Sequence, residues 1–195
     1  KRAGRGTFSF YDAALDDQMR ERRTLANELR AAIGTDQLLL HYQPLYEADG
    51  ATLTGYEALV RWQHPTRGMV PPSQFVPLAE DTGLIDSLGT WVLQEACRQA
   101  ASWPAPLSVS VNLSAAQFRR DDLLQTVVAA LGEAGLPPTR LELEITESLL
   151  MNNTERVVRM LSAIGAIGVR IAMDDFGTGY SSLAYLWRFP FDKVK

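Results

Sequence analysis

Oxygen-bearing side chains recur at one end of the strand-like segments of this chain. Glu57 lies in GYEALVRW, Asn112 in VSVNLS and Glu144 in LELEIT, while Asp174 and Asp175 end the apolar run VRIAM. Ligands of barrels and open α/β sheets bind at the carboxyl ends of the strands, where such side chains converge on one mouth. We therefore expect these residues to form one site.

Several carboxylates at one mouth need a positive charge among them, because they repel one another and a buried unpaired charge is costly. Oxygen ligands of this kind suit a hard cation, Mg²⁺ or Mn²⁺, and such ions suit phosphate ester chemistry. Arg61, four residues after Glu57, could add a positive group for a phosphate. A zinc site is not expected, because His41 and His64 are not spaced as a metal pair and Cys97 lies in a helical pattern.

Plainer readings exist for single residues. Each acidic strand end taken alone fits a helix N-cap or a surface carboxylate, and only their recurrence favours a site. Ser181 and Ser182 fit a helix start better than a nucleophile, because no histidine is near them in the sequence. The GTG at residues 177–179 lacks the third glycine of a dinucleotide-binding loop.

The elements that position these residues begin with a helix and a hairpin. Helical spacing over residues 16–33 ends at Gly34. Strand-like runs within residues 38–62 flank Asp49 and Gly50, a dipeptide that favours a tight reversal and hence an antiparallel pair. A second helical pattern covers residues 86–103.

Three strand-helix units follow. Strands are expected over residues 107–114, 140–146 and 169–173, with helices that end near Gly135 and Gly168 and a third at 181–187, before a further strand after Pro190. Ser114 and Gln117 form a capping-box pattern at the first of these helices. This alternation predicts a parallel sheet, either open and doubly wound or closed as a barrel.

Composition narrows the class of protein. The 195 residues are 46% hydrophobic and 22% charged, as in a soluble globular protein. A net charge of −4 offers no basic field to nucleic acid, so we expect no DNA or RNA partner. One cysteine cannot form an internal disulfide, and no apolar segment reaches the roughly 20 residues of a membrane span. We expect a cytoplasmic domain, whose parent protein could still be membrane-anchored.

Five segments resemble, in order, the signature motifs of the EAL domain family. They are YEALVRWQHP at 56–65, SVNLS at 110–114, LEITES at 143–148, DDFGTGYSSL at 174–183 and FDKVK at 191–195. Members of that family have a TIM-like barrel with one antiparallel strand, and they hydrolyse cyclic di-GMP to linear pGpG with Mg²⁺ or Mn²⁺. The resemblance implies an α/β fold, a TIM-like (β/α) barrel with an antiparallel first strand pair, incomplete in this chain.

The opening KRAGRGTFSFYD resembles the final strand of a GGDEF domain, which synthesises the same nucleotide. We expect residues 1–12 to be that strand, 13–35 a linker helix, and 36–195 the N-terminal part of an EAL domain. A barrel of this kind needs about 250 residues. The resemblance implies that the proposed general-base glutamate and another nucleotide-site glutamine would follow Lys195 in the parent protein. We therefore expect weak or absent hydrolysis by the chain alone.

The resemblance also implies a metal site that holds two ions. Glu57, Asn112, Glu144 and Asp174 are the expected metal ligands, and Asp175 is the expected ligand of the second ion. Glu57, Asp174 and Asp175 are therefore also expected catalytic residues.

Further roles follow from the same resemblance. Lys195 is the remaining expected catalytic residue, which helps to hold the attacking water. Gln43, Leu59 and Arg61 are expected beside the bound nucleotide. Glu147 is expected to brace the loop after the two aspartates, a segment linked to dimerisation, so we expect a homodimer through the EAL domain.

Two other functions stay open. The protein could be a non-catalytic receptor that binds cyclic di-GMP and signals by conformation, although an intact set of metal ligands counts against this. Without the family resemblance, the same residues also fit another metal-dependent barrel enzyme, such as one that stabilises an enolate.

Overall fold

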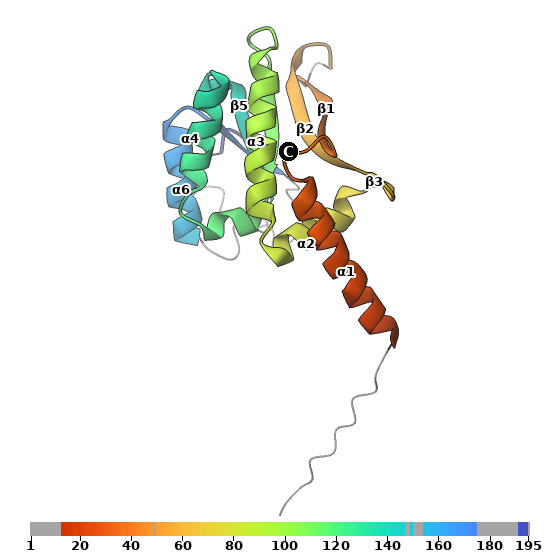
Figure 1. Cartoon of the computed structure of the whole chain (residues 1–195). Coiled ribbons are helices and arrows are strands. Elements are labelled where there is room, and N and C mark those ends of the chain that lie inside the picture. Colours follow the sequence, from red (N-terminus) through yellow and green to blue (C-terminus); the bar gives the residue numbers. More distant parts are fainter. Residues whose placement is uncertain (1–12, 49, 147–148, 150–153, 175–190, 195) are drawn as a thin grey trace, which may run out of the picture.

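The computed structural model describes residues 13–48, 50–146, 149, 154–174 and 191–194. In these ranges helices cover one face of a mixed β-sheet (Figure 1). The predicted α/β class is confirmed, and within the described ranges the sheet does not close into a barrel. Among the same residues, no helix combines the length and apolar composition needed to cross a membrane.

The chain enters through helix α1 (Ala13–Ala32), as the helical spacing predicted. Its inward side buries Leu25, Leu29 and Ala32, and Gly34 follows with a φ of 84°, a conformation that glycine adopts without strain. The exposed side is held by ion pairs. Arg67 Nη1 lies 3.0 Å from Glu21 Oε1. The second half of α1 is thus packed against the body of the fold.

The predicted hairpin is confirmed. Strand β1 (Leu38–Tyr46) pairs antiparallel with β2 (Leu53–His64), with Leu38 opposite Trp62, and Gly50 between them has a φ of 71°. A short strand, β3 (Gly68–Val70), pairs with the end of β2.

Helix α2 (Pro72–Thr82) was not predicted from the sequence. Pro72 is at the first helical position, where proline is tolerated, but Pro77 lies inside the helix, where proline removes a backbone donor and is disfavoured. The helix forms because Phe75, Leu78 and Ala79, at helical spacing, are all buried in the core.

The later elements follow the predicted alternation. They are α3 (Ile85–Ala101), β4 (Ser108–Leu113), η1 (Ala115–Arg119), α4 (Leu123–Ala134), η2 (Pro138–Arg140), β5 (Leu141–Thr146), α6 (Thr154–Ala166), β6 (Arg170–Asp174) and β7 (Lys193–Val194). The helix expected at 181–187 lies outside the described residues.

One predicted helix is in fact two. The capping box of Ser114 and Gln117 is present, but it starts the 3-10 helix η1 rather than a helix that runs to Gly135. Arg120 is extended, and α4 begins anew after Asp122. The charged run at 119–122 offers no apolar residue to bury, so the chain turns there. Gly135, with a φ of 63°, ends α4 as predicted.

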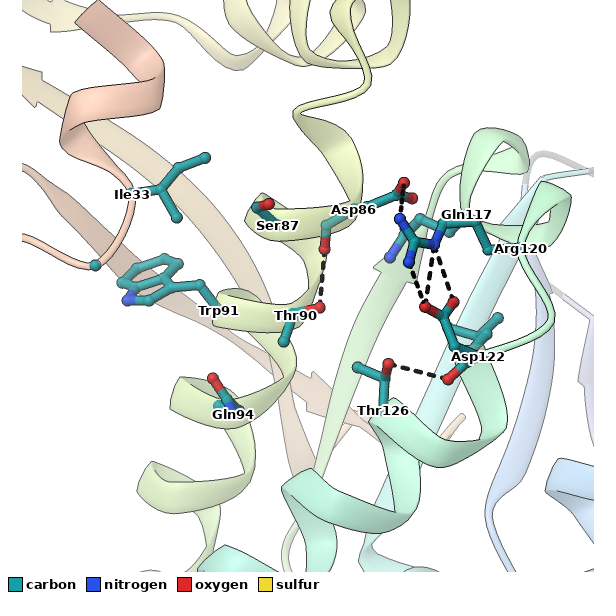
Figure 2. Close-up of a pocket in the computed structure, with 12 residues that line it drawn as sticks. Ile33, Asp86, Ser87, Thr90, Trp91, Gln94, Gln117, Arg120, Asp122 and Thr126 are labelled. Carbon is teal, nitrogen blue, oxygen red and sulfur yellow. Dashed lines mark hydrogen bonds and ion pairs between the residues drawn. The ribbon is translucent and has the colours of Figure 1, made fainter.

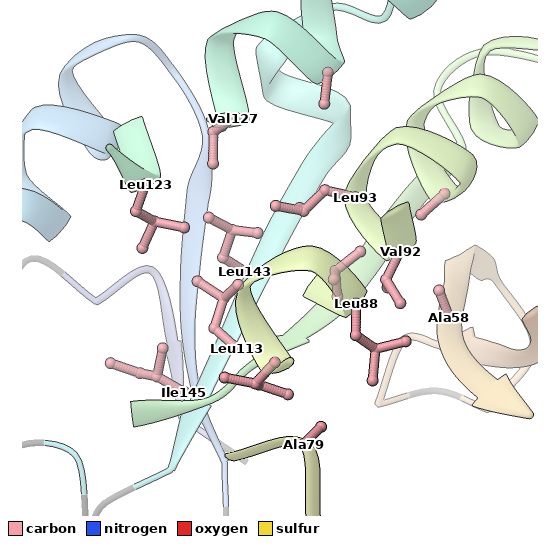
Figure 3. Close-up of a cluster of buried hydrophobic side chains, with 14 of the residues drawn as sticks. Ala58, Ala79, Leu88, Val92, Leu93, Leu113, Leu123, Val127, Leu143 and Ile145 are labelled. Atoms are coloured by element: carbon pink, nitrogen blue, oxygen red, sulfur yellow. The ribbon is translucent and has the colours of Figure 1, made fainter. Parts of the chain in front are cut away.

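The sheet has the order β1-β2-β4-β5-β6-β7, and all pairs after β1 and β2 on this path are parallel. Its side chains alternate between two unlike faces. One face carries Val109, Val111 and Leu113 of β4 and Leu143 and Ile145 of β5, all buried. Figure 3 shows Leu113, Leu143 and Ile145 packed with Leu93 of α3 and Val127 of α4. The helices therefore bury this apolar face.

The opposite face is polar. It carries Ser108, Ser110 and Asn112 on β4, Glu142, Glu144 and Thr146 on β5, and Arg170 and Asp174 on β6. In a strand, alternate residues share a face, so the polar set and the apolar core are interleaved along the same segments. The sheet thus presents a polar surface that ends, at the carboxyl ends of the parallel strands, in the predicted mouth.

Candidate functional site

The structure brings Glu57 and Asn112 together. They lie on the neighbouring parallel strands β2 and β4, and Nδ2 of Asn112 donates a hydrogen bond of 2.7 Å to Oε1 of Glu57. Glu57 is half-buried and Asn112 exposed, so solvent reaches this contact in part. Because Nδ2 is the donor in this contact, Oδ1 of Asn112 takes no part in it.

Glu144 and Asp174 continue this row on the next two strands. Glu144 is opposite Asn112 in the β4–β5 register and is 1% exposed. Asp174 lies opposite Thr146 at the end of β6, two residues beyond Ala172, the partner of Glu144. All four expected ligands that are described therefore share the polar face. Asn112, Glu144 and Asp174 lie near the carboxyl ends of their strands, whereas Glu57 is the fifth of the 12 residues of β2 and not at the strand end that the sequence predicted. Asp175, the expected fifth ligand, lies outside the described residues.

The residues expected at the nucleotide lie near Glu57 in the β1–β2 hairpin. Gln43 is exposed and directly opposite Glu57 in the hairpin register. Leu59 and Arg61 follow Glu57 at alternate positions of β2, and Nη1 of Arg61 donates to the Val60 carbonyl at 2.9 Å. Lys195 and Glu147, the other expected functional residues, are outside the described part of the chain.

A cavity of about 450 Å³ opens beside these residues. Leu59, Arg61, Asn112 and Thr146 line it from the strands, and residues of α2, α3 and η1 complete the wall. Its volume lies in the range of ligand-binding pockets, and its lining combines an apolar wall with a few polar groups. Of the expected site residues, Asn112, Leu59 and Arg61 line this cavity, whereas Glu57, Glu144, Asp174 and Gln43 are not part of its lining.

The donor set suits a hard cation. Glu57, Asn112 and Glu144 offer carboxylate and amide oxygens, the ligands that Mg²⁺ and Mn²⁺ prefer. No group of three or more His, Cys, Asp or Glu side chains within the described ranges is arranged to hold a metal. Asn112 is not one of these four residue types, so it adds an amide oxygen beyond them. The residues that are described thus fit a metal site in part, with carboxylate and amide neighbours on adjacent strands.

The histidines and the cysteine are positioned elsewhere. His64 is 5% exposed, its Nδ1 accepts from the backbone N–H of Thr66 at 3.2 Å, and its Nε2 lies 3.3 Å from Glu28. His41 is exposed on β1. Cys97 is fully buried in α3, and burial raises the pKa of its thiol to about 12, so the sulfur stays protonated at neutral pH. These side chains serve packing or the surface.

Two groups of polar residues escaped the sequence analysis. Glu142 precedes Glu144 by two residues on the polar face of β5 and is buried. Its Oε1 accepts a hydrogen bond from Ser110 Oγ at 2.9 Å. The alternation in LELEIT could have revealed it, because both glutamates share one face. Glu80, at the end of α2, accepts from Ser114 Oγ at 2.6 Å. No local pattern marks this contact, since α2 itself was not predicted.

A second cavity, of about 440 Å³, lies among the helices (Figure 2). There Arg120 Nη2 is 2.7 Å from Asp122 Oδ2, and Arg120 Nη1 is 3.6 Å from Asp86 Oδ2. The guanidinium holds the pKa of the Asp122 carboxyl below its usual value, chiefly through its hydrogen bond. One guanidinium here is shared by two carboxylates, and none of the expected site residues lines this cavity. It is a less suitable site than the strand-end cavity.

The fold and the row of oxygen donors at the strand ends define an α/β domain of the TIM-like barrel type. A family model described as the EAL domain matches residues 26–195. The chain belongs to the EAL domain family, and the fold class predicted from its motifs is confirmed. The match begins within α1.

Similar proteins agree with this assignment. An uncharacterized signaling protein of Caulobacter vibrioides is 53% identical over 195 residues, which cover 100% of this chain and 24% of that protein. MucR of Pseudomonas aeruginosa, named as a bifunctional diguanylate cyclase/cyclic di-GMP phosphodiesterase, is 44% identical over 199 residues, which cover 100% of this chain and 29% of MucR. The chain thus spans 24–29% of the length of these curated relatives.

A solved structure gives the same result in three dimensions. The PaMucR phosphodiesterase in complex with c-di-GMP matches with a TM-score of 0.83 and 47% sequence identity, over 88% of this chain and 71% of that one.

Proposed function

We propose that the parent protein is a metal-dependent phosphodiesterase that hydrolyses cyclic di-GMP to linear pGpG. The observation that carries this proposal is the 2.7 Å contact between Asn112 and Glu57, with Glu144 level with Asn112 on the next strand and a cavity alongside. The complex of PaMucR with c-di-GMP and the name of MucR support the choice of nucleotide.

One set of residues would bind the metal ions, and another would bind the nucleotide. Glu57, Asn112, Glu144 and Asp174 would hold Mg²⁺ or Mn²⁺, with Asp175 at a second ion. Such ions, when bound, lower the pKa of water and neutralise charge on a phosphate.

The nucleotide residues act around this row. Arg61, at the cavity wall, would pair with a phosphate, since a guanidinium matches phosphate geometry. Leu59 gives an apolar surface for a base, and exposed Gln43 offers an amide. The roles of Lys195 with the attacking water and of Glu147 with the loop after Asp175 rest on the family resemblance.

Organisation of the parent protein belongs to the same proposal. We assign residues 1–12 to the end of a GGDEF domain, 13–35 to a linker helix and 36–195 to the EAL domain, in a cytoplasmic part of the protein. The bifunctional name of MucR supports an adjoining GGDEF domain. A homodimer through the EAL domain is part of the proposal and rests on the resemblance.

The proposal is tested by incubating the full-length parent protein with cyclic di-GMP and Mn²⁺ and separating the products by chromatography. We expect pGpG, and none in the presence of a chelator. Nucleotide binding without pGpG would instead establish a receptor. Calorimetry with cyclic di-GMP and a panel of carboxylate substrates tests the enolate alternative, which requires heat from a carboxylate.

The same assay applied to the 195-residue chain should show weak or absent turnover. The resemblance places the general base beyond Lys195. A rate equal to that of the full-length protein would contradict this expectation.

A further inference from the structure

The carboxyl end of β4 is fixed by a polar contact with another element. Ser114 follows Asn112 by two residues, and its hydroxyl donates to Glu80 Oε1 of α2 at 2.6 Å. Such a short contact to a carboxylate is typical of charge-assisted hydrogen bonds, which are stronger than neutral ones. Glu80 and Ser114 are both half-buried, so water only partly competes with the contact.

Ser114 is also held from its other side. Its backbone N–H donates to Gln117 Oε1 at 2.9 Å, and its Oγ accepts from the Ala116 N–H at 3.1 Å. Gln117 is 6% exposed, and α3 makes room for it at Gly89, where an added Cβ would lie 2.1 Å from Gln117 Nε2. We call Glu80, Ser114 and Gln117 the β4 clamp. Three elements thus meet at the end of this strand.

The β4 clamp lies at the site itself. Its three residues line the strand-end cavity together with Asn112 and Arg61. A shift of Ser114 would move Asn112, because only Leu113 separates them, and Asn112 in turn donates to Glu57. The chain of contacts therefore runs from α2 to the expected metal ligands.

Capping of η1 does not account for Glu80. The capping box needs only Ser114 and Gln117, and both of its hydrogen bonds are present without a contribution from α2. The Glu80 contact is therefore additional to the cap. Its effect is to tie the end of β4 to α2.

We propose that Glu80 is a positioning residue for the metal site, which acts through Ser114 to fix Asn112 and, with it, Glu57. This inference rests on the proposed function. In metal sites, groups that orient the ligands contribute strongly to affinity, although they never touch the ion. Among the described contacts, Glu80 is such an orienting group, because it bonds Ser114 and is not itself an expected ligand.

The test compares Glu80→Ala, Glu80→Gln and Asp81→Ala in the full-length protein, with Mn²⁺ binding measured by calorimetry. Glu80→Ala should weaken Mn²⁺ binding by about 10–100-fold. Glu80→Gln should stay within about threefold of wild type, because its amide oxygen still accepts from Ser114. Asp81→Ala is the matched control on the same helix, since Asp81 pairs with Arg22 of α1 rather than with β4.

Kinetics give a second readout. Glu80→Ala should lower kcat at limiting Mn²⁺ and recover at excess Mn²⁺, with little change in KM for cyclic di-GMP. If Glu80→Ala does not fold, Ser114→Ala removes the same bond from the donor side, together with the η1 cap, and should weaken Mn²⁺ binding at least as much.

The proposal is overturned if the folded Glu80→Ala or Ser114→Ala protein binds Mn²⁺ within about twofold of wild type, because the orienting effect would then be absent. Wild-type protein that binds Mn²⁺ without forming pGpG would overturn the proposed function alone. The comparison of Mn²⁺ affinities would still decide the role of Glu80.

Discussion

The two faces of the sheet are made by the same strands, yet they meet opposite demands. On the apolar face, Leu143 and Ile145 have no exposed surface and pack against the helices (Figure 3). On the polar face, Glu144 sits between them in sequence and lies in register with Asn112 near the strand ends. Stability and chemistry are therefore separated by side-chain direction rather than by segment of the chain.

The largest expected effect is on the polar face. Glu57→Ala in the full-length protein should lower turnover of cyclic di-GMP by more than about a thousandfold, equivalent to roughly 4 kcal/mol. Glu57 is the expected ligand that Asn112 contacts. The melting temperature of the Glu57→Ala protein should change little, because Glu57 is only half-buried.

Glu57→Gln is the matched control for shape. It keeps an oxygen that can accept from Asn112 but removes the charge, so it should also lose turnover while the fold stays intact. Unchanged turnover in either variant would show that the assignment of Glu57 to the metal is wrong.

The apolar face should give the reverse result. Leu143→Ala is expected to lower the free energy of unfolding by about 2–5 kcal/mol, because a fully buried side chain leaves a cavity. Denaturant titration measures this, and turnover per folded molecule should remain near wild type. A stable variant with lost activity would break the separation between the two faces.

A smaller effect is expected lower on the polar face. Ser110→Ala removes the donor to Glu142, and both side chains are buried, so we expect a loss of about 1.5–3 kcal/mol. Adding Glu142→Gln should recover part of this loss, since the buried charge is then gone. If Ser110→Ala costs nothing, the polar face matters only at its rim.

Local sequence signals predicted much of the fold. Gly50 marked the hairpin, Gly135 and Gly168 followed helices, and Ser114 with Gln117 formed the expected cap. These features depend on a few neighbouring residues, which a sequence displays directly. The topology of parallel strands then allowed Glu57 and Asn112 to be placed together across 55 residues.

Contacts without a local signal were missed. Helix α2 is stabilised by burial of Phe75 and Leu78, which overrides the interior Pro77. The bond between Glu80 and Ser114 joins residues 34 positions apart through that unpredicted helix. Such features require knowledge of which elements meet.

The strict alternation along β5 has a consequence for how the site is assembled. A slip of one residue against β4 would send Glu144 into the helix-covered core and Ile145 to the mouth, so burial of the leucines opposes every wrong alignment. Apolar side chains therefore decide which oxygen atoms become neighbours. They do so during folding, before an ion or a nucleotide binds.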